Sequence, residues 1–154
     1  GDLRFGIFIM ITKIEFKHHI FMLCLATALW TYYFLGGLSS SYYQSWPFLK
    51  TLIIVDIIPG LFLIPIGVYL FKSIIGHDYF IASIWAAIYG SFPLALYDHI
   101  YLSTVYDVSF INYLENYWYL SSFHIVPWIV FPSVGFVLSK RKIHQLRRRA
   151  LSRN

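Results

Sequence analysis

Four long apolar stretches, separated by short polar segments, divide the chain. About 20 consecutive apolar residues can cross a hydrocarbon core of roughly 30 Å as one helix. The pattern therefore predicts an all-α integral membrane protein with four transmembrane helices, organised as one membrane domain over residues 1–154. The four stretches are residues 20–38, 49–71, 79–103 and 119–139.

The polar segments indicate how these helices are joined. Residues 5–12 are apolar but too short to span, so we expect them to form an interfacial helix along the membrane surface. Residues 72–78 form a short connection, which makes the second and third helices antiparallel neighbours. Residues 39–47 and 104–118 carry tyrosines and tryptophans typical of the aromatic belt at the headgroup level. The second of these two segments is expected to form a short outer interfacial helix or a structured loop.

The third stretch carries its small residues on one face. One series recurs at every fourth position and leads to His99: Ser83, Ala87, Ser91 and Ala95. A second series leads to Asp98: Ala82, Ala86 and Gly90. Residues four apart share a helix face, and small residues let membrane helices approach closely. We therefore expect this face to pack against another helix and to turn Asp98 and His99 inward.

The second stretch contains helix-breaking residues: Pro59, Gly60, Pro65 and Gly67. A proline inside a helix removes one backbone hydrogen bond and clashes with the preceding turn. We therefore expect this helix to be kinked.

The composition excludes a soluble globular domain. Hydrophobic residues make up 58% of the chain and charged residues only 12%, whereas soluble domains carry roughly 25% charged residues. The single cysteine, Cys24, excludes an intrachain disulfide framework and a multi-cysteine metal site. A net charge of +5 would suggest nucleic-acid binding in a soluble protein. Here the basic residues are explained by membrane topology, and no nucleic-acid partner is expected.

The basic residues predict the orientation of the four helices. Eleven of the twelve lysines and arginines fall on one side of a four-helix arrangement, and Lys50 alone falls on the other. By the positive-inside rule, both termini are expected to be cytoplasmic. The basic tail, residues 140–154, is expected to contact anionic lipid, with an acidic cytoplasmic partner as the alternative. The clustered residues are Lys140, Arg141, Lys142, Arg147, Arg148 and Arg149.

Four ionisable side chains are predicted to share one layer in the outer half of the membrane: Asp56, Asp98, His99 and His124. Such residues inside a bilayer are costly and by default paired and functional. Two carboxylates and two imidazoles could share protons or bind a transition metal such as copper, zinc or iron. Two alternatives remain: a structural hydrogen-bonded pair, or simple placement where the helices meet water. A haem held by His99 and His124 is disfavoured, and no ligand-spacing motif such as HExxH is present.

These observations support three hypotheses for the function. The first is an accessory, non-catalytic subunit of a larger membrane complex, for example an oxidoreductase, with lipids and other membrane subunits as its partners. The second is a small membrane-embedded metal-site enzyme or metal-binding subunit that uses the Asp/His layer. The third is a proton-coupled carrier in which Asp56 and Asp98 relay protons.

Overall fold

Every regular element in the part of the chain that the structure describes is a helix. The computed structural model describes residues 14–35, 37, 41–76 and 78–151. Four helices are long and apolar enough to cross a membrane, which confirms the predicted all-helical architecture with four apolar helices. Their bounds are Phe16–Leu35, Phe48–Ile75, Tyr79–Tyr106 and Trp118–Leu151. The interfacial helix expected at residues 5–12 lies outside the described residues.

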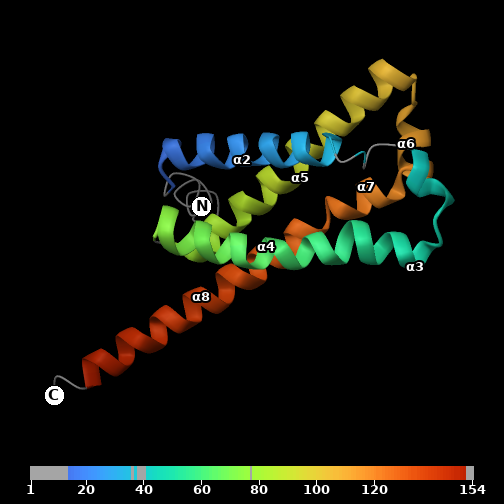
Figure 1. The fold of residues 1–154 in the computed structure, drawn as a ribbon. Coiled ribbons are helices and arrows are strands. Elements are labelled where there is room, and N and C mark those ends of the chain that lie inside the picture. The colour runs from blue at the N-terminus through green and yellow to red at the C-terminus, as the bar shows by residue number, and fades with distance from the viewer. Residues whose placement is uncertain (1–13, 36, 38–40, 77, 152–154) are drawn as a thin grey trace, which may run out of the picture.

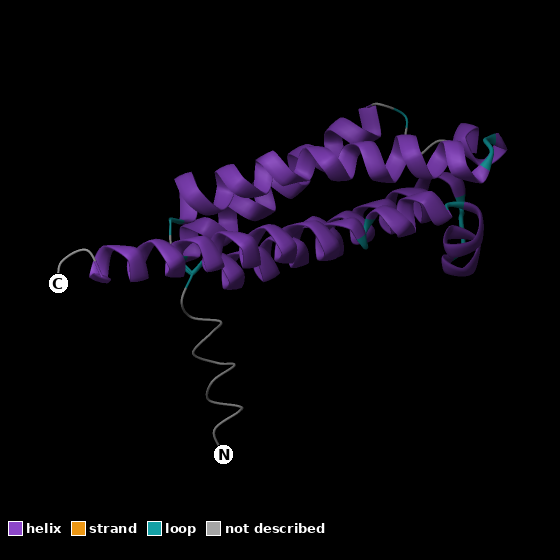
Figure 2. Cartoon of the chain, turned by 90° about the horizontal axis from the view of Figure 1, so that it is seen from below, coloured by secondary structure: helices purple, strands orange, loops and turns teal. Residues whose placement is uncertain are grey.

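The four long helices cross the bundle in alternating directions (Figure 1). The start of α2 (Phe16–Leu35), the turn before α5 (Tyr79–Tyr106) and the C-terminal half of α8 (Val126–Leu151) lie at one end. The 3-10 helix η1 (Ser41–Ser45) and the short helices α3 (Phe48–Thr51), α6 (Phe110–Asn116) and α7 (Trp118–Phe123) lie toward the opposite end (Figure 1). The view turned by 90° shows the long helices running side by side (Figure 2). The most extensive contact is between α5 and α8, followed by α4 with α8 and α2 with α5.

The second long helix changes its hydrogen-bonding pattern three times, between α-helical and π-helical segments. It consists of α3 (Phe48–Thr51), the π-helix η2 (Leu52–Ile57), α4 (Ile58–Tyr69) and the π-helix η3 (Leu70–Ile75). Pro59 has no N–H to donate to the carbonyl of Val55. The α-helical hydrogen-bond pattern is therefore interrupted just before Pro59, and a π-helical turn replaces it. This change of pattern places Asp56 within a π-helical turn, and the kink expected for this helix stays a prediction.

The fourth long helix is broken near its beginning. The short helix α7 (Trp118–Phe123) ends at His124, and α8 begins at Val126. Pro127 cannot donate to the carbonyl of Phe123, which explains why the chain turns at this point. The predicted helix 119–139 missed this break. Beyond the predicted span, α8 continues through the basic tail to Leu151, and residues 140–151 are all exposed.

The small residues of α5 face α8. Ser83, Ala87 and Ser91 are buried, whereas Gly90 and Ala95 are half-buried. A Cβ atom on Gly90 would lie 3.1 Å from Cβ of Pro127. The indole N–H of Trp128 donates to the hydroxyl of Ser91 at 2.9 Å. The two helices therefore approach along a strip without large side chains, as membrane helices do at close contacts.

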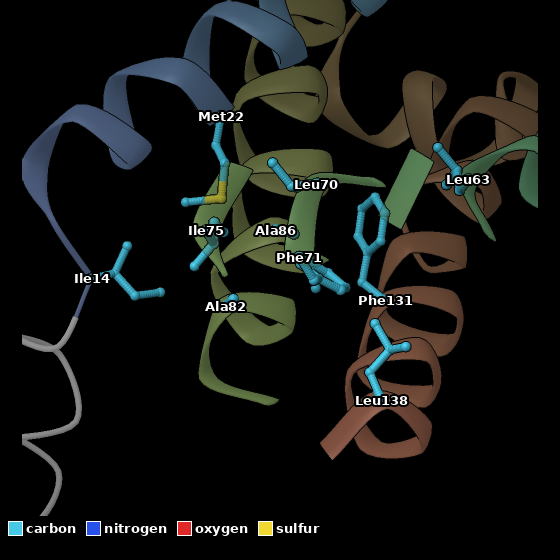
Figure 3. Packing of buried hydrophobic residues seen from close by; sticks show 11 residues of the cluster. Ile14, Met22, Leu63, Leu70, Phe71, Ile75, Ala82, Ala86, Phe131 and Leu138 are labelled. Atoms are coloured by element: carbon cyan, nitrogen blue, oxygen red, sulfur yellow. The ribbon is translucent and has the colours of Figure 1, made fainter. Parts of the chain in front are cut away.

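Apolar side chains fill the half of the bundle nearest the termini (Figure 3). Phe71 of η3 and Phe131 of α8 contact each other with ring centroids 6.1 Å apart. Met22 of α2 and Ala86 of α5 belong to the same cluster. The polar side chains that matter for function lie toward the other end, where α5 meets α6 and α7.

Candidate functional site

Asp98 lies on the packed face of α5. Leu94 and Leu102, one turn before and after it, are buried, and Asp98 itself is only 7% exposed. The series of small residues predicted this orientation, because positions four apart along a helix share a face. A carboxylate this deep in an apolar bundle needs donors, since an unpaired buried charge is strongly unfavourable.

Two side chains from other helices contact the Asp98 carboxylate. The indole N–H of Trp30, on α2, donates to Oδ1 at 2.8 Å. Nε2 of His124, at the break of the fourth helix, lies 3.2 Å from Oδ2. One carboxylate thus joins α2, α5 and the junction of α7 and α8.

His124 makes a further contact through the same ring nitrogen. The hydroxyl of Tyr113, on α6 (Phe110–Asn116), lies 3.1 Å from Nε2. The other ring nitrogen, Nδ1, is buried and has no hydrogen-bond partner among the described residues. A cavity of about 20 Å³ is lined by both Asp98 and His124, which is large enough for one water molecule. We call Trp30, Asp98, Tyr113 and His124 the aspartate–histidine cluster.

Tyr113 lies outside the four long helices, on the short helix that closes this end of the bundle. Burial raises the pKa of its hydroxyl to about 12, and the negative charge of Asp98 acts in the same direction. The tyrosine therefore keeps its proton near neutral pH, and its hydroxyl accepts from His124 when Nε2 carries the ring proton and donates when Nε2 carries the lone pair.

Asp56 lies nearby but forms a contact of its own. The hydroxyl of Ser122, two residues before His124, donates to its Oδ2 at 2.7 Å. Its other oxygen, Oδ1, is buried without a hydrogen-bond partner in the described part of the chain. The π-helical turn of η2 presents this carboxylate to α7, and no hydrogen bond between described residues joins it to the aspartate–histidine cluster.

His99 lies on the other side of Tyr113. Its ring packs against Phe110 and Tyr113, with centroid separations of 5.5 and 6.2 Å. Its Nδ1 is buried and has no hydrogen-bond partner within the described residues. Of the four predicted layer residues, the structure thus brings Asp98 and His124 into direct contact, whereas Asp56 and His99 lie beside this pair with other neighbours.

The predicted metal site has no complete ligand set in this arrangement. Within residues 14–35, 37, 41–76 and 78–151, no three side chains of His, Cys, Asp or Glu gather so that they could hold a metal ion. Asp98 and His124 are the two members of the layer that contact each other directly. Metal binding by this layer remains a prediction.

Two further histidines, His18 and His19, lie at the beginning of the bundle, away from the aspartate–histidine cluster. The helix α2 begins at Phe16, four residues before the predicted span, so both histidines lie on it. His18 is buried, and the His19 ring packs edge-on against Trp85 of α5 at 4.6 Å.

Sequence reasoning also missed three side chains of this region: Trp30, Tyr113 and Ser122. The partner of Trp30 could have been predicted from the sequence. An indole N–H inside a bundle requires an acceptor, and an intramembrane aspartate requires donors, so the two were natural partners. No comparable indication was present for Tyr113 and Ser122. Tyrosine and serine are abundant in this part of the chain, and their partners depend on how each helix is oriented about its axis.

Comparisons of this chain with protein-family models, with curated proteins and with solved structures give no match. The geometry and chemistry of the aspartate–histidine cluster are therefore the basis on which a function is proposed.

Proposed function

We propose that this chain is a multi-pass membrane protein that takes up and releases a proton at the Asp98–His124 pair, as a small proton-coupled carrier does. The observation that carries the proposal is the 3.2 Å contact between His124 Nε2 and Asp98 Oδ2. It lies inside the bundle, at the break of the fourth helix. Histidine is the side chain whose charge changes near neutral pH, and intramembrane acid–histidine pairs are the usual components of proton relays.

The protonation chemistry uses one identified atom. When the His124 ring is neutral, Nε2–H donates to the Asp98 carboxylate and Nδ1 carries a lone pair. A proton that binds at Nδ1 forms an N–H bond and leaves an imidazolium beside a carboxylate. The pair is then electrically neutral, whereas it carries one negative charge before uptake. Release breaks the same N–H bond and restores the starting state.

The interrupted helices around the pair also support a carrier. In many secondary transporters, the substrate or coupling-ion site lies where membrane helices are discontinuous, because irregular backbone is tolerated where it lines a protein cavity. Here the fourth helix breaks at His124, and the π-helical turn η2 carries Asp56 beside it. These irregular segments provide positions at which the backbone can change shape as charge is gained or lost.

The test is proton uptake by the purified full chain in lipid. Infrared difference spectra between about pH 5 and pH 8, the range in which histidine titrates, are expected to show an imidazole signal that disappears in His124→Gln and shifts in Asp98→Asn. In vesicles that contain a pH-sensitive dye, both variants should lower voltage-driven proton flux to that of protein-free vesicles. His144→Gln, which removes an exposed histidine of the tail, is the matched control and should preserve flux and the His124 signal.

Two results would replace this proposal with another hypothesis. If no His124-dependent proton uptake is observed and a constant set of membrane proteins co-purifies in mild detergent, the accessory-subunit hypothesis accounts for the protein. If the purified protein contains stoichiometric copper, zinc or iron that is lost in His124→Gln, the layer is a metal site.

For the orientation, we propose that both termini face the cytoplasm. The support is the distribution of lysines and arginines. Lys17, Lys72 and the basic tail belong to elements at the end of the bundle nearest the termini, whereas Lys50 belongs to α3 at the opposite end. Positive residues are concentrated on the cytoplasmic side of membrane proteins.

Cysteine labelling tests this orientation. In a Cys24→Ser background, Gln44→Cys should react with an impermeant maleimide in intact cells, and Arg148→Cys should react only after the membrane is opened. The reverse pattern would place the termini outside and contradict the proposal.

A further inference from the structure

A basic pocket lies at the end of the bundle nearest the termini, far along α8 from the aspartate–histidine cluster. It has a volume of about 330 Å³. Four of its lining residues are cationic: Lys72 from η3, and Arg141, Lys142 and Arg149 from α8. From the sequence, the six clustered basic residues of the tail were interpreted as one group. In the fold, three of the six line the pocket, together with Lys72 from another helix.

The helical period of α8 explains which residues of the tail line the pocket. Arg141, Gln145 and Arg149 follow each other at intervals of four residues, and so do Leu138, Lys142 and Leu146. Residues four apart share a face, so these six side chains form one side of the helix, directed toward η3 and the start of α5. Within the described part of the tail, up to Leu151, three other lysines and arginines do not line the pocket: Lys140, Arg147 and Arg148.

The pocket concentrates positive charge without a lining carboxylate. No aspartate or glutamate is among its lining residues in the described part of the chain. The ammonium of Lys142 lies 5.1 Å from the ring centroid of Tyr79, a cation–π contact that holds this lysine against the first turn of α5. The positive charges of Lys72, Arg141 and Lys142, which line one pocket, repel one another, and an anion placed among them reduces that repulsion.

The lining also has an apolar side. Leu138 is buried and belongs to the apolar core, and Tyr79 and Leu146 continue this surface outward. The pocket therefore joins a cationic rim to the apolar part of the bundle, at the level where η3 ends and α5 begins. A ligand that matches both parts carries a phosphate next to hydrocarbon, as a membrane lipid does.

We propose that this pocket binds the phosphate of an anionic membrane lipid. Guanidinium groups bind phosphate oxygens through paired hydrogen bonds, and lysines add compact positive charge. Basic pockets between membrane helices are suited to anionic headgroups. Lys72 and Lys142 bind the headgroup from two different helices, so the lipid connects η3 to α8. The proposal is independent of proton binding at Asp98–His124.

The test compares two variants that lose the same number of positive charges. Lys72→Gln/Lys142→Gln removes two pocket lysines, and Lys140→Gln/Arg148→Gln removes two exposed tail charges outside the pocket. Full-length protein in detergent is titrated with phosphatidylglycerol and, separately, with phosphatidylcholine, and retained lipid is counted by native mass spectrometry. The wild type should retain phosphatidylglycerol in preference to phosphatidylcholine. The pocket variant should bind it about thirtyfold more weakly, because each basic residue near an anionic surface contributes about fivefold.

The control variant should stay within about threefold of the wild type, since charges outside the pocket act only through screened, long-range attraction. Equal weakening in both variants would show a diffuse basic tail without a specific site and would overturn the proposal. Equal retention of phosphatidylcholine would also overturn it, because the phosphate is then not recognised as part of an anionic lipid. If inorganic phosphate displaces the lipid at equal concentration, the pocket binds a free phosphate group instead.

Discussion

We expect His124→Ala to lower the free energy of unfolding by about 3 kcal/mol, because removal of one partner leaves a buried carboxylate without its counterpart. Asp98 would keep the indole N–H of Trp30 as a donor but lose the contact that His124 Nε2 makes at 3.2 Å. The Tyr113 hydroxyl would lose its imidazole neighbour in the same step. Unfolding of the purified protein by a denaturing detergent, followed by circular dichroism, measures the change.

The double variant separates coupling from a general loss of packing. The neutral amide that Asp98→Asn introduces needs no cationic partner. Asp98→Asn combined with His124→Ala should therefore be little less stable than His124→Ala alone, with a coupling of about 0.5–3 kcal/mol. Asp98→Asn combined with Tyr89→Phe is the control. Position 89 lies nine residues away, about 13 Å along α5 at 1.5 Å per residue, and those two effects should add. Additive effects of Asp98→Asn and His124→Ala would contradict the contact.

The second large effect is expected at Gly135, where α8 comes closest to α5. A Cβ atom there would lie 2.5 Å from Cβ of Ser83 and 2.7 Å from the carbonyl oxygen of Tyr79. Gly135→Leu should therefore destabilise the protein by about 3 kcal/mol, the upper end of the usual cost of overpacking. The gain in helix propensity from replacing glycine is only about 1 kcal/mol. The cost of the steric overlap exceeds this gain, because a backbone carbonyl cannot rotate away as a side chain can.

Val137→Leu is the matched control for this change. It adds a methylene two residues along the same helix at a side chain that is 47% exposed, so it should leave the unfolding curve nearly unchanged. If Gly135→Leu also leaves the curve unchanged, α5 and α8 are not in close contact. Gly90→Leu extends the series. Its Cβ would lie 3.1 Å from Cβ of Pro127, and a smaller destabilisation is expected because this overlap is less severe than the one at Gly135.

The local sequence pattern was sufficient to predict the apolar helices and the face of α5 that packs against another helix. Long apolar runs are a property of neighbouring residues, so four membrane-length helices were predictable without tertiary contacts. The four-residue spacing from Ser83 to Ala95 likewise predicted which side of α5 faces a partner. Local pattern was less informative about helix ends. Hydropathy reports where apolar residues stop, whereas a helix continues as long as its backbone can hydrogen-bond, as α8 does to Leu151.

Pairing of the polar residues required the tertiary structure. Sequence position predicted that Asp56, Asp98, His99 and His124 lie at similar depth, but depth leaves open how each helix is rotated about its axis. Rotation depends on packing over the whole interface, including the approach of Gly135 to Ser83 and the turn that Pro127 imposes after His124. Only the assembled bundle therefore decides that Asp98 contacts His124 and Trp30, whereas Asp56 contacts Ser122. The sequence by itself determined the apolar helices and the position of each charged residue along its helix, because these depend on residues close together in the chain. The tertiary structure decided the pairs, because these depend on residues far apart in it.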